Sequence, residues 1–245
     1  MKVLVIGEIC EDIFIYGDCK RLSPEAPVPV LNPIEINNND GMSGNVVRNI
    51  RAIDSSVYVE HWHQSQKITK TRFVDKKSNH MFLRLDEGEE NVSPMNFSFS
   101  ILSELESYDI VLVSDYDKGF LSHDFIKNIG KSSKLSILDS KKKLTKEIIE
   151  SFTFVKLNEK ESLNNEDLRE SKNIITTLGS KGAQHNGVIY PTPNPKETID
   201  VSGAGDTFTA AFILNFYKTK NVGDSIVFAN EMASLVVSKR GVATP

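Results

Sequence analysis

The residues best suited to chemistry lie late in the chain, where small residues lead into an aspartate and then an apolar stretch. Gly203, Ala204, Gly205 and Asp206 stand directly before residues 207–217, which are typical of a helix. The unpaired N–H groups at a helix start form an anion site, and glycines let a phosphate approach the backbone closely. A carboxylate there can accept the proton of an attacking hydroxyl. The turn predicts phosphoryl transfer, with Asp206 as general base; the alternative is a plain helix cap.

Two other kinds of nucleotide site are excluded by the sequence. No Gly-x-x-x-x-Gly-Lys-Ser/Thr run occurs, so the chain is not a P-loop protein. The late Gly-x-Gly does not complete a dinucleotide fingerprint, because Phe208 stands at the place of its third glycine.

The composition is that of an ordinary globular protein. The chain has 245 residues, of which 39% are hydrophobic and 25% charged, with a formal net charge of -4. This charge balance does not indicate a basic surface that would bind nucleic acid or an anionic membrane. With Cys10 and Cys19 as its only cysteines, the chain has no disulfide framework, and no apolar run is long enough to span a bilayer. We expect a cytoplasmic protein.

The elements that must position these residues alternate along the chain. Short apolar runs predict buried strands, and periodic segments between them predict helices. The strands are expected at 3–6, 110–113, 135–138, 154–157 and 174–177, and the helices at 45–52, 124–130, 145–150, 207–217 and 222–237. This alternation favours an α/β fold in which helices flank a mostly parallel central sheet.

Two further segments read as half-exposed antiparallel strands. Residues 12–35 and 67–86 alternate apolar and polar side chains, and we expect them to form a small β-strand lid on a single kinase domain of residues 1–245. Asn186-Gly187 predicts a tight hairpin turn. The polar runs 37–40 and 141–143 read as a surface turn and a solvated charge run.

Several motifs, in one order, resemble the PfkB (ribokinase-like) carbohydrate kinases. The segment Asp200–Thr207 resembles their C-terminal signature, and Gly41-Met42-Ser43-Gly44-Asn45 resembles the Gly-Gly-x-x-Asn element that contacts the sugar. The resemblance implies a ribokinase-like fold, ATP and Mg²⁺ as cofactors, and a nucleotide site made by Asn158, Glu161, Thr177, Gly179, Gly182 and Asn230. Glu161 would hold magnesium through water, the alternative being an ordinary surface glutamate.

A narrower resemblance is to D-glycero-β-D-manno-heptose 7-phosphate kinases. It rests on residues 21–30, 70–72, 83–86 and 114–119. It implies phosphorylation of O1 of a heptose that already carries a 7-phosphate. Cations and hydrogen-bonding groups in or near the matched segments suit such a sugar phosphate. The expected substrate-binding residues are Asp12, Gly41, Asn45, Lys70, Arg72, Arg84, Asp86, Asp115 and Lys118.

Some of these assignments have structural alternatives. Asp12 can be a turn-forming aspartate, and Asn45 a helix N-cap. Arg84 and Asp86 can pair with neighbouring strand residues instead of contacting substrate. At the level of function, a kinase for another sugar and a non-catalytic sugar-phosphate or nucleotide-binding protein stay open. Exposed strands also favour a homodimer formed through the lid.

The sequence departs from the family in four places. Glu8 stands where an aspartate is usual, and Met42 replaces the second glycine of the sugar-binding pair. The stretch between Val57 and Lys70 is shorter than expected by about a helix and a strand, and a terminal segment after Pro245 is expected to be missing. We therefore expect changes at the adenine pocket and at one edge of the sheet.

Overall fold

Continuous apolar runs form the buried strands of the main sheet. The computed structural model describes residues 1–96, 98–168, 171–193, 201–239 and 243–245. The strands of the main sheet are β1 Lys2–Gly7, β4 Tyr58–Trp62, β7 Ile110–Asp115, β8 Ser136–Ser140, β9 Phe154–Asn158, β10 Ile174–Thr177, β11 Ala183–His185 and β12 Val188–Tyr190. Their order is β12-β11-β10-β9-β8-β7-β1-β4, and only β11 and β12 run antiparallel to their neighbours. The mostly parallel sheet is confirmed.

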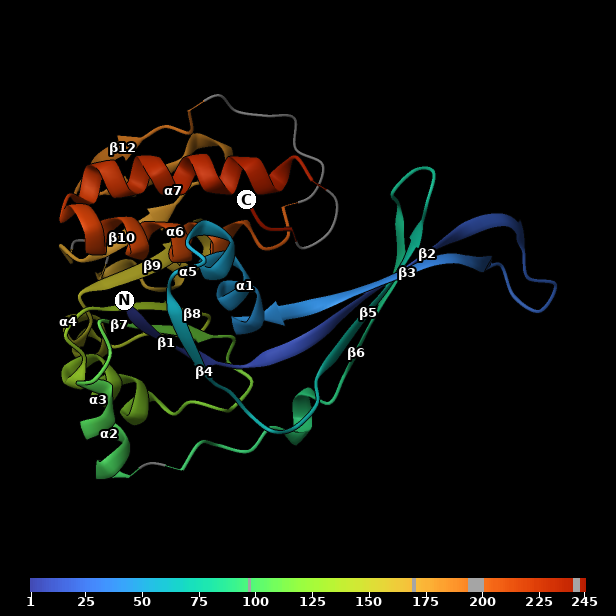
Figure 1. The fold of residues 1–245 in the computed structure, drawn as a ribbon. Coiled ribbons are helices and arrows are strands. Elements are labelled where there is room, and N and C mark those ends of the chain that lie inside the picture. Colours follow the sequence, from blue (N-terminus) through green and yellow to red (C-terminus); the bar gives the residue numbers. More distant parts are fainter. Residues whose placement is uncertain (97, 169–170, 194–200, 240–242) are drawn as a thin grey trace.

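Helices cover both faces of this sheet (Figure 1). The helices are α1 Ser43–Ile53, α2 Phe99–Leu105, α3 His123–Ser132, α4 Lys146–Ser151, α5 Glu159–Asn164, α6 Ala204–Thr219 and α7 Val222–Val237, with short 3-10 turns at Glu89–Asn91, Glu166–Leu168 and Gly179–Lys181. One core cluster packs α1, α6 and α7 against the sheet, and the other packs α2, α3 and α4 against its opposite face. All five predicted helices and all five predicted strands are present.

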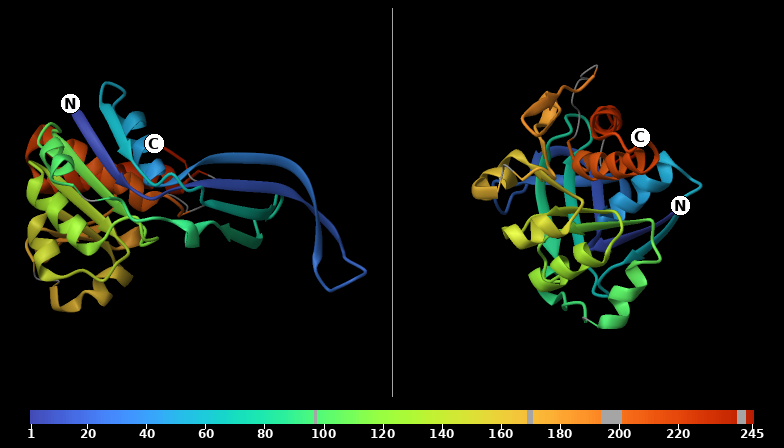
Figure 2. Two further views of the ribbon diagram at one scale, coloured as in Figure 1. Left: turned by 90° about the horizontal axis from the view of Figure 1, so that it is seen from below. Right: turned by 90° about the vertical axis from the view of Figure 1, so that its left-hand side faces the viewer.

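A second sheet projects from the body as a long arm (Figures 1 and 2). It contains β2 Ile9–Leu22, β3 Pro29–Met42, β5 Thr69–Asp75 and β6 Met81–Glu87, in the order β3-β2-β5-β6. The prediction of antiparallel strands is wrong for one pair, since β2 and β5 run parallel. The reason lies in the main sheet: β1 and β4 pair in parallel there, and β2 and β5 follow them out of the body in the same direction.

A local sequence signal was overridden at residues 37–40, and another was obeyed at Asn186 and Gly187. Residues 37–40 are part of β3 and not a surface turn, because β2 supplies a partner along their whole length. The edge strand β4 was not predicted; it occupies the shortened stretch before Lys70. The hairpin at Asn186 and Gly187 is confirmed, and both residues have the positive φ of 48° and 77° that its turn requires.

No helix in the described ranges is both long and apolar enough to cross a bilayer. Both cysteines are free thiols, with Cys10 buried and Cys19 partly exposed.

Candidate active site

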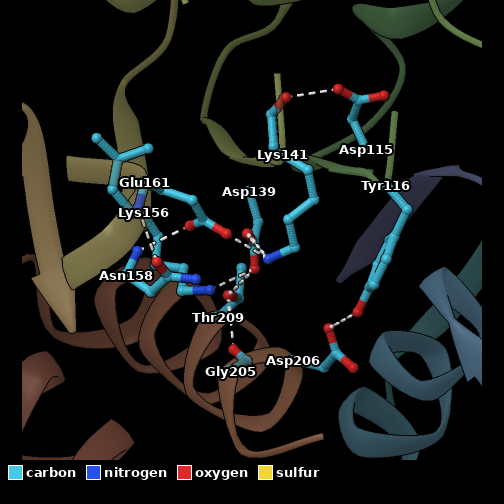
Figure 3. Close-up of polar contacts among 12 residues, drawn as sticks. Asp115, Tyr116, Asp139, Lys141, Lys156, Asn158, Glu161, Gly205, Asp206 and Thr209 are labelled. Carbon is cyan, nitrogen blue, oxygen red and sulfur yellow. Dashed lines mark hydrogen bonds and ion pairs between the residues drawn. The ribbon is translucent and has the colours of Figure 1, made fainter. Parts of the chain in front are cut away.

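Asp206 is a buried carboxylate in the first turn of α6. Its side chain does not cap the helix. Asn45 Nδ2 donates to Asp206 Oδ2 at 2.9 Å. The Tyr116 hydroxyl donates to Asp206 Oδ1 at 2.8 Å (Figure 3). Burial raises the pKa of Asp206 to about 6, although the hydrogen bond from Asn45 acts in the opposite direction. The group is therefore a carboxylate with a proton affinity suited to a base near neutral pH.

The turn before Asp206 contains a left-handed backbone conformation, which glycine adopts easily. Gly203 is the N-cap of α6 with φ 81°, and no side chain caps the helix. The Ala204 N–H donates to the Val201 carbonyl at 3.3 Å, which leaves the N–H groups of Gly205 and Asp206 as the candidate anion donors. A Cβ on Gly205 would lie 3.1 Å from Lys156 Nζ. The expected anion-binding turn of Gly203, Ala204 and Gly205 thus lies beside a cation. Asp200, the first residue of the motif, lies outside the described residues.

The same turn forms one wall of a cavity of about 650 Å³. Asn158, Thr177, Gly179, Gly182 and Asn230, all expected at the nucleotide, line this cavity with the Gly203–Asp206 turn. Asn230 Nδ2 donates to the Tyr190 carbonyl at 2.9 Å, which fixes α7 against β12. The structure therefore gathers residues from four separate motifs around one space.

The spacing of Asn158 and Glu161 produces a capping box. The Asn158 side chain accepts from the Glu161 N–H, and Glu161 Oε2 accepts from the Asn158 N–H, both at 2.8 Å. Glu161 Oε1 accepts from Lys141 Nζ at 2.5 Å. Glu161 is buried, so it is not an ordinary surface glutamate. In the described part of the chain, no group of three or more His, Cys, Asp or Glu side chains gathers as a metal site.

Polar residues that sequence reasoning missed complete the cavity wall (Figure 3). Asp139 on β8 accepts from Lys156 Nζ at 2.8 Å and from the Thr209 hydroxyl at 3.2 Å. Burial alone would raise the pKa of Asp139, but the ammonium groups of Lys156 and Lys141 hold it below its ordinary value. The prediction that residues 141–143 form a solvated charge run holds only in part: Lys143 is exposed, whereas Lys142 is buried and Lys141 lines the cavity.

Asp115 is not part of this cavity wall. Its side chain accepts from Ser140 at 2.5 Å and from Lys142 Nζ at 2.8 Å, deep at the end of β7. The carboxylate thus ties two neighbouring strand ends together, and no described contact brings it to the other expected substrate-binding residues. Its motif neighbour Tyr116, which had no assigned role, reaches Asp206 instead.

Glu8 organises the loop that carries Tyr116. The fully buried carboxylate accepts from the backbone N–H groups of Tyr116 at 2.8 Å, Lys118 at 3.0 Å and Phe120 at 3.3 Å. In the same loop Asp117 and Gly119 have positive φ, and the N–H groups of the alternate residues 116, 118 and 120 point to Glu8. The departure from the usual aspartate therefore has a structural consequence: the longer side chain holds the loop next to Asp206.

The other expected substrate-binding residues lie mostly on one face of the second sheet. Asp12, Lys70 and Asp86 are directly opposite one another, and Arg72 and Arg84 are opposite each other two residues further along their strands, on the same face. Asp12 forms an ion pair with Arg72 at 2.5 Å. Gly41 lies beside them because a Cβ there would fall 2.1 Å from Asp12 Oδ2. Asp12 is not a turn residue, and Asn45 is the third residue of α1 and not its N-cap.

The cations of this face are paired with carboxylates. Glu89, which the sequence did not single out, accepts from Lys118 Nζ at 2.5 Å and also from Lys70. Lys70 contacts Asp86 at 2.9 Å, and Arg84 donates to both oxygens of Asp86 at 2.8 and 3.0 Å. Burial alone would raise the pKa of Glu89, but its hydrogen bonds with the two lysines hold it below its ordinary value. A bound phosphate would have to exchange with these carboxylates.

Met42 has a backbone conformation that favours glycine. Its φ is 53°, in the region that glycine prefers, and its side chain packs in a small buried cluster with Cys10 and Ile68. The side chain fills the base of the second sheet.

Comparison with known proteins defines the class of this chain. Residues 51–245 match the family described as pfkB family carbohydrate kinase. The bifunctional protein HldE of a Nitratiruptor species is 30% identical over 292 residues, which cover 99% of this chain and 63% of that protein. HldE of Helicobacter pylori (strain J99) is 29% identical over 297 residues, covering 99% and 64%. The 292 aligned positions exceed the 245 residues here, so parts of HldE have no counterpart in this chain.

Solved structures show the same fold. Ribokinase of Arabidopsis thaliana, complexed with ribose and ATP, superimposes with a TM-score of 0.73 at 17% identity, covering 98% of this chain and 93% of that one. Thermotoga maritima ribokinase gives 0.75 at 18%, covering 98% and 94%.

The fold and the family match define an ATP-dependent carbohydrate kinase with a ribokinase-like fold. The chain belongs to the pfkB family of carbohydrate kinases. It spans slightly less than two thirds of the length of the HldE proteins it matches.

Proposed function

We propose that this chain transfers the γ-phosphoryl group of ATP to O1 of D-glycero-D-manno-heptose 7-phosphate, giving the 1,7-bisphosphate and ADP. The observation that carries the proposal is the position of Asp206. It belongs to the wall of the 650 Å³ cavity, and through Asn45 and Tyr116 it contacts the elements at the base of the second sheet. A base placed between a nucleotide and a sugar needs this position.

The proposed reaction balances around Asp206. The O1–H proton passes to the carboxylate, O1 forms a bond to the γ-phosphorus, and the bond from that phosphorus to the β-phosphate oxygen breaks as ADP leaves. Asn45 and Tyr116 each use one lone pair of Asp206, so the carboxylate keeps acceptor capacity for the sugar hydroxyl. Closure of the second sheet over the sugar would exclude water from this step.

Magnesium fits the donor set of the cavity. Asp139 Oδ1 is buried without a hydrogen-bond partner and belongs to a residue of the cavity wall. We propose that Asp139 holds Mg²⁺ together with Glu161, which would act through water because its own oxygens are occupied. The ion would neutralise charge on the phosphate oxygens.

The sugar assignment rests on the HldE relatives and on the cationic face of the second sheet. We expect the highest kcat/KM with heptose 7-phosphate in a coupled ADP-release assay against fructose 6-phosphate and free hexoses. Free heptose should show a higher KM than its 7-phosphate, because Lys70, Arg72 and Lys118 would lose the phosphate.

Two results would contradict this assignment. Equal kcat/KM for heptose and heptose 7-phosphate would show that the enzyme does not recognise the 7-phosphate. Binding of an ATP analogue without turnover of any acceptor would favour a non-catalytic binding protein.

We further propose a cytoplasmic homodimer formed through the second sheet. The sheet face opposite the cations carries an apolar row of Ile15, Ile36, Phe73 and Leu83 in register, and Ile36 and Leu83 are 64% and 58% exposed. A second copy of the chain would cover this row, since an open apolar sheet invites pairing.

The dimer is tested by sedimentation at micromolar concentration. We expect a dimer for the natural chain and a monomer for Ile36→Lys/Leu83→Lys, whose charges would be buried in the contact. Asn37→Lys, on the same strand and the opposite face, is the matched control and should stay dimeric. A monomeric natural chain would contradict the proposal.

A further inference from the structure

Lys156 is a buried cation in a strand whose preceding and following residues are apolar. It lies on β9 between the fully buried Val155 and Leu157, and its side chain is 3% exposed. Although buried, it forms part of the wall of the 650 Å³ cavity. Placing an ammonium group in such a position costs free energy unless its hydrogen bonds and its charge are satisfied.

Asp139 satisfies only part of that demand. The ammonium group has three N–H donors, and within the described residues its single acceptor is Asp139 Oδ2 at 2.8 Å. Asp139 is itself held by Thr209, while its Oδ1 atom has no hydrogen-bond partner. Both members of this buried pair therefore keep unused hydrogen-bonding capacity at the cavity wall, which buried polar groups rarely do.

The position of the ammonium group identifies the kind of ligand. Lys156 Nζ lies 3.1 Å from where a Cβ of Gly205 would be, against the first turn of α6. A cation beside a helix N-terminus is repelled by the macrodipole, so the arrangement is unfavourable without an anion. No side chain caps this turn, and beyond the Ala204 N–H, which donates to the Val201 carbonyl, the N–H groups of Gly205 and Asp206 can serve an anion. An anion bound there would satisfy the helix end and the lysine together.

We propose that Lys156 binds the terminal phosphoryl group of the nucleotide, with Asp139 as the residue that positions its ammonium group. The inference rests on the proposed function, because it takes the anion at the Gly203–Asp206 turn to be the transferring phosphate. Lys156 would donate its free N–H groups to oxygens that gain charge as the phosphoryl group moves to the sugar.

The alternative is that Lys156 only neutralises Asp139. The two roles predict different effects of the third phosphate on the affinity for the nucleotide. A phosphate-binding lysine distinguishes a triphosphate from a diphosphate, whereas a neutralising lysine affects the affinity for both equally.

The test compares the dissociation constants of AMP-PNP and ADP by calorimetry, with Mg²⁺ and without sugar. For Lys156→Met we expect AMP-PNP to bind roughly ten- to a hundredfold more weakly, as for the loss of a charge-assisted hydrogen bond, with a much smaller change for ADP. Turnover should fall by roughly 10²–10³-fold. Lys134→Met, at an exposed lysine just before β8, is the matched control and should change neither constant.

A double variant tests the role of Lys156 even if the single variant does not fold. Lys156→Met/Asp139→Asn leaves no buried charge unpaired, so it should fold even where the single variant does not. We expect it to have lost the preference for AMP-PNP over ADP as well. An unchanged preference in the variants would overturn the role of Lys156 and leave only neutralisation of Asp139.

The same data separate this inference from the proposed function. A natural chain that binds AMP-PNP but phosphorylates no sugar would refute the proposed function, and the nucleotide comparison would still decide on Lys156. A natural chain that phosphorylates a sugar, with an unchanged preference in Lys156→Met, would refute the inference alone. A natural chain that binds neither nucleotide would refute both.

Discussion

Asp206→Asn is expected to lower kcat by roughly 10²–10⁴-fold, the range that a positioned general base contributes. The substitution keeps the size of the side chain and removes its ability to accept the proton of the sugar hydroxyl. The KM for ATP should change little, because the backbone N–H groups of the α6 turn stay in place. Asp124→Asn, on an aspartate whose side chain is 88% exposed, is the matched control and should keep full activity.

The pH dependence of the natural chain gives an independent check of the same base. Burial raises the pKa of Asp206 to about 6, so the protonated, inactive form should accumulate as the pH falls through 6. An ordinary aspartate would stay ionised to about pH 4. We therefore expect an acidic limb of kcat centred near pH 6, absent from the residual activity of Asp206→Asn. Normal turnover by this variant would refute the assignment of Asp206.

Glu8→Gln is expected to destabilise the fold and to lower activity together. Three backbone N–H groups of the loop after β7 donate to the Glu8 carboxylate. An amide accepts through one atom only and turns its NH₂ group toward a donor, which we expect to cost about 2–4 kcal/mol of unfolding free energy. Because the loop also carries Tyr116, its displacement would disturb the hydrogen bond to Asp206 and reduce kcat.

Urea unfolding and steady-state kinetics measure the two effects of Glu8→Gln. Glu147→Gln, on a glutamate whose side chain is 74% exposed, is the control for the same chemical change and should be silent in both. Glu8→Asp restores the residue usual in the family but shortens the side chain, and we expect it to rescue stability only in part. Stability and kcat equal to those of the natural chain would show that the Glu8 charge does not organise this loop.

Local signals were sufficient for some elements of the fold but not for all of them. Residues 222–237 are the bounds of α7 as predicted, because an apolar periodic segment follows a capping asparagine and a helix of this kind depends on its own side chains. The Asn186-Gly187 turn is similarly determined by the backbone conformations that these two residues adopt. The parallel pairing of β2 with β5 was missed because it follows from β1 and β4, which lie far apart in the sequence.

The Gly203–Asp206 turn shows most clearly which features follow from the sequence alone and which depend on the tertiary structure. By itself the sequence determined that small residues and a carboxylate begin a helix, which is an anion site by the geometry of any helix start. Only the tertiary structure decided that Asn45 and Tyr116 hold the carboxylate, and that Lys156 and Asp139 lie beside the same turn. Charge pairing and burial depend on which side chains the folded chain brings together. In this protein those partners come from strands, helices and the loop after β7, and Asn45 and Asp206 are 161 positions apart.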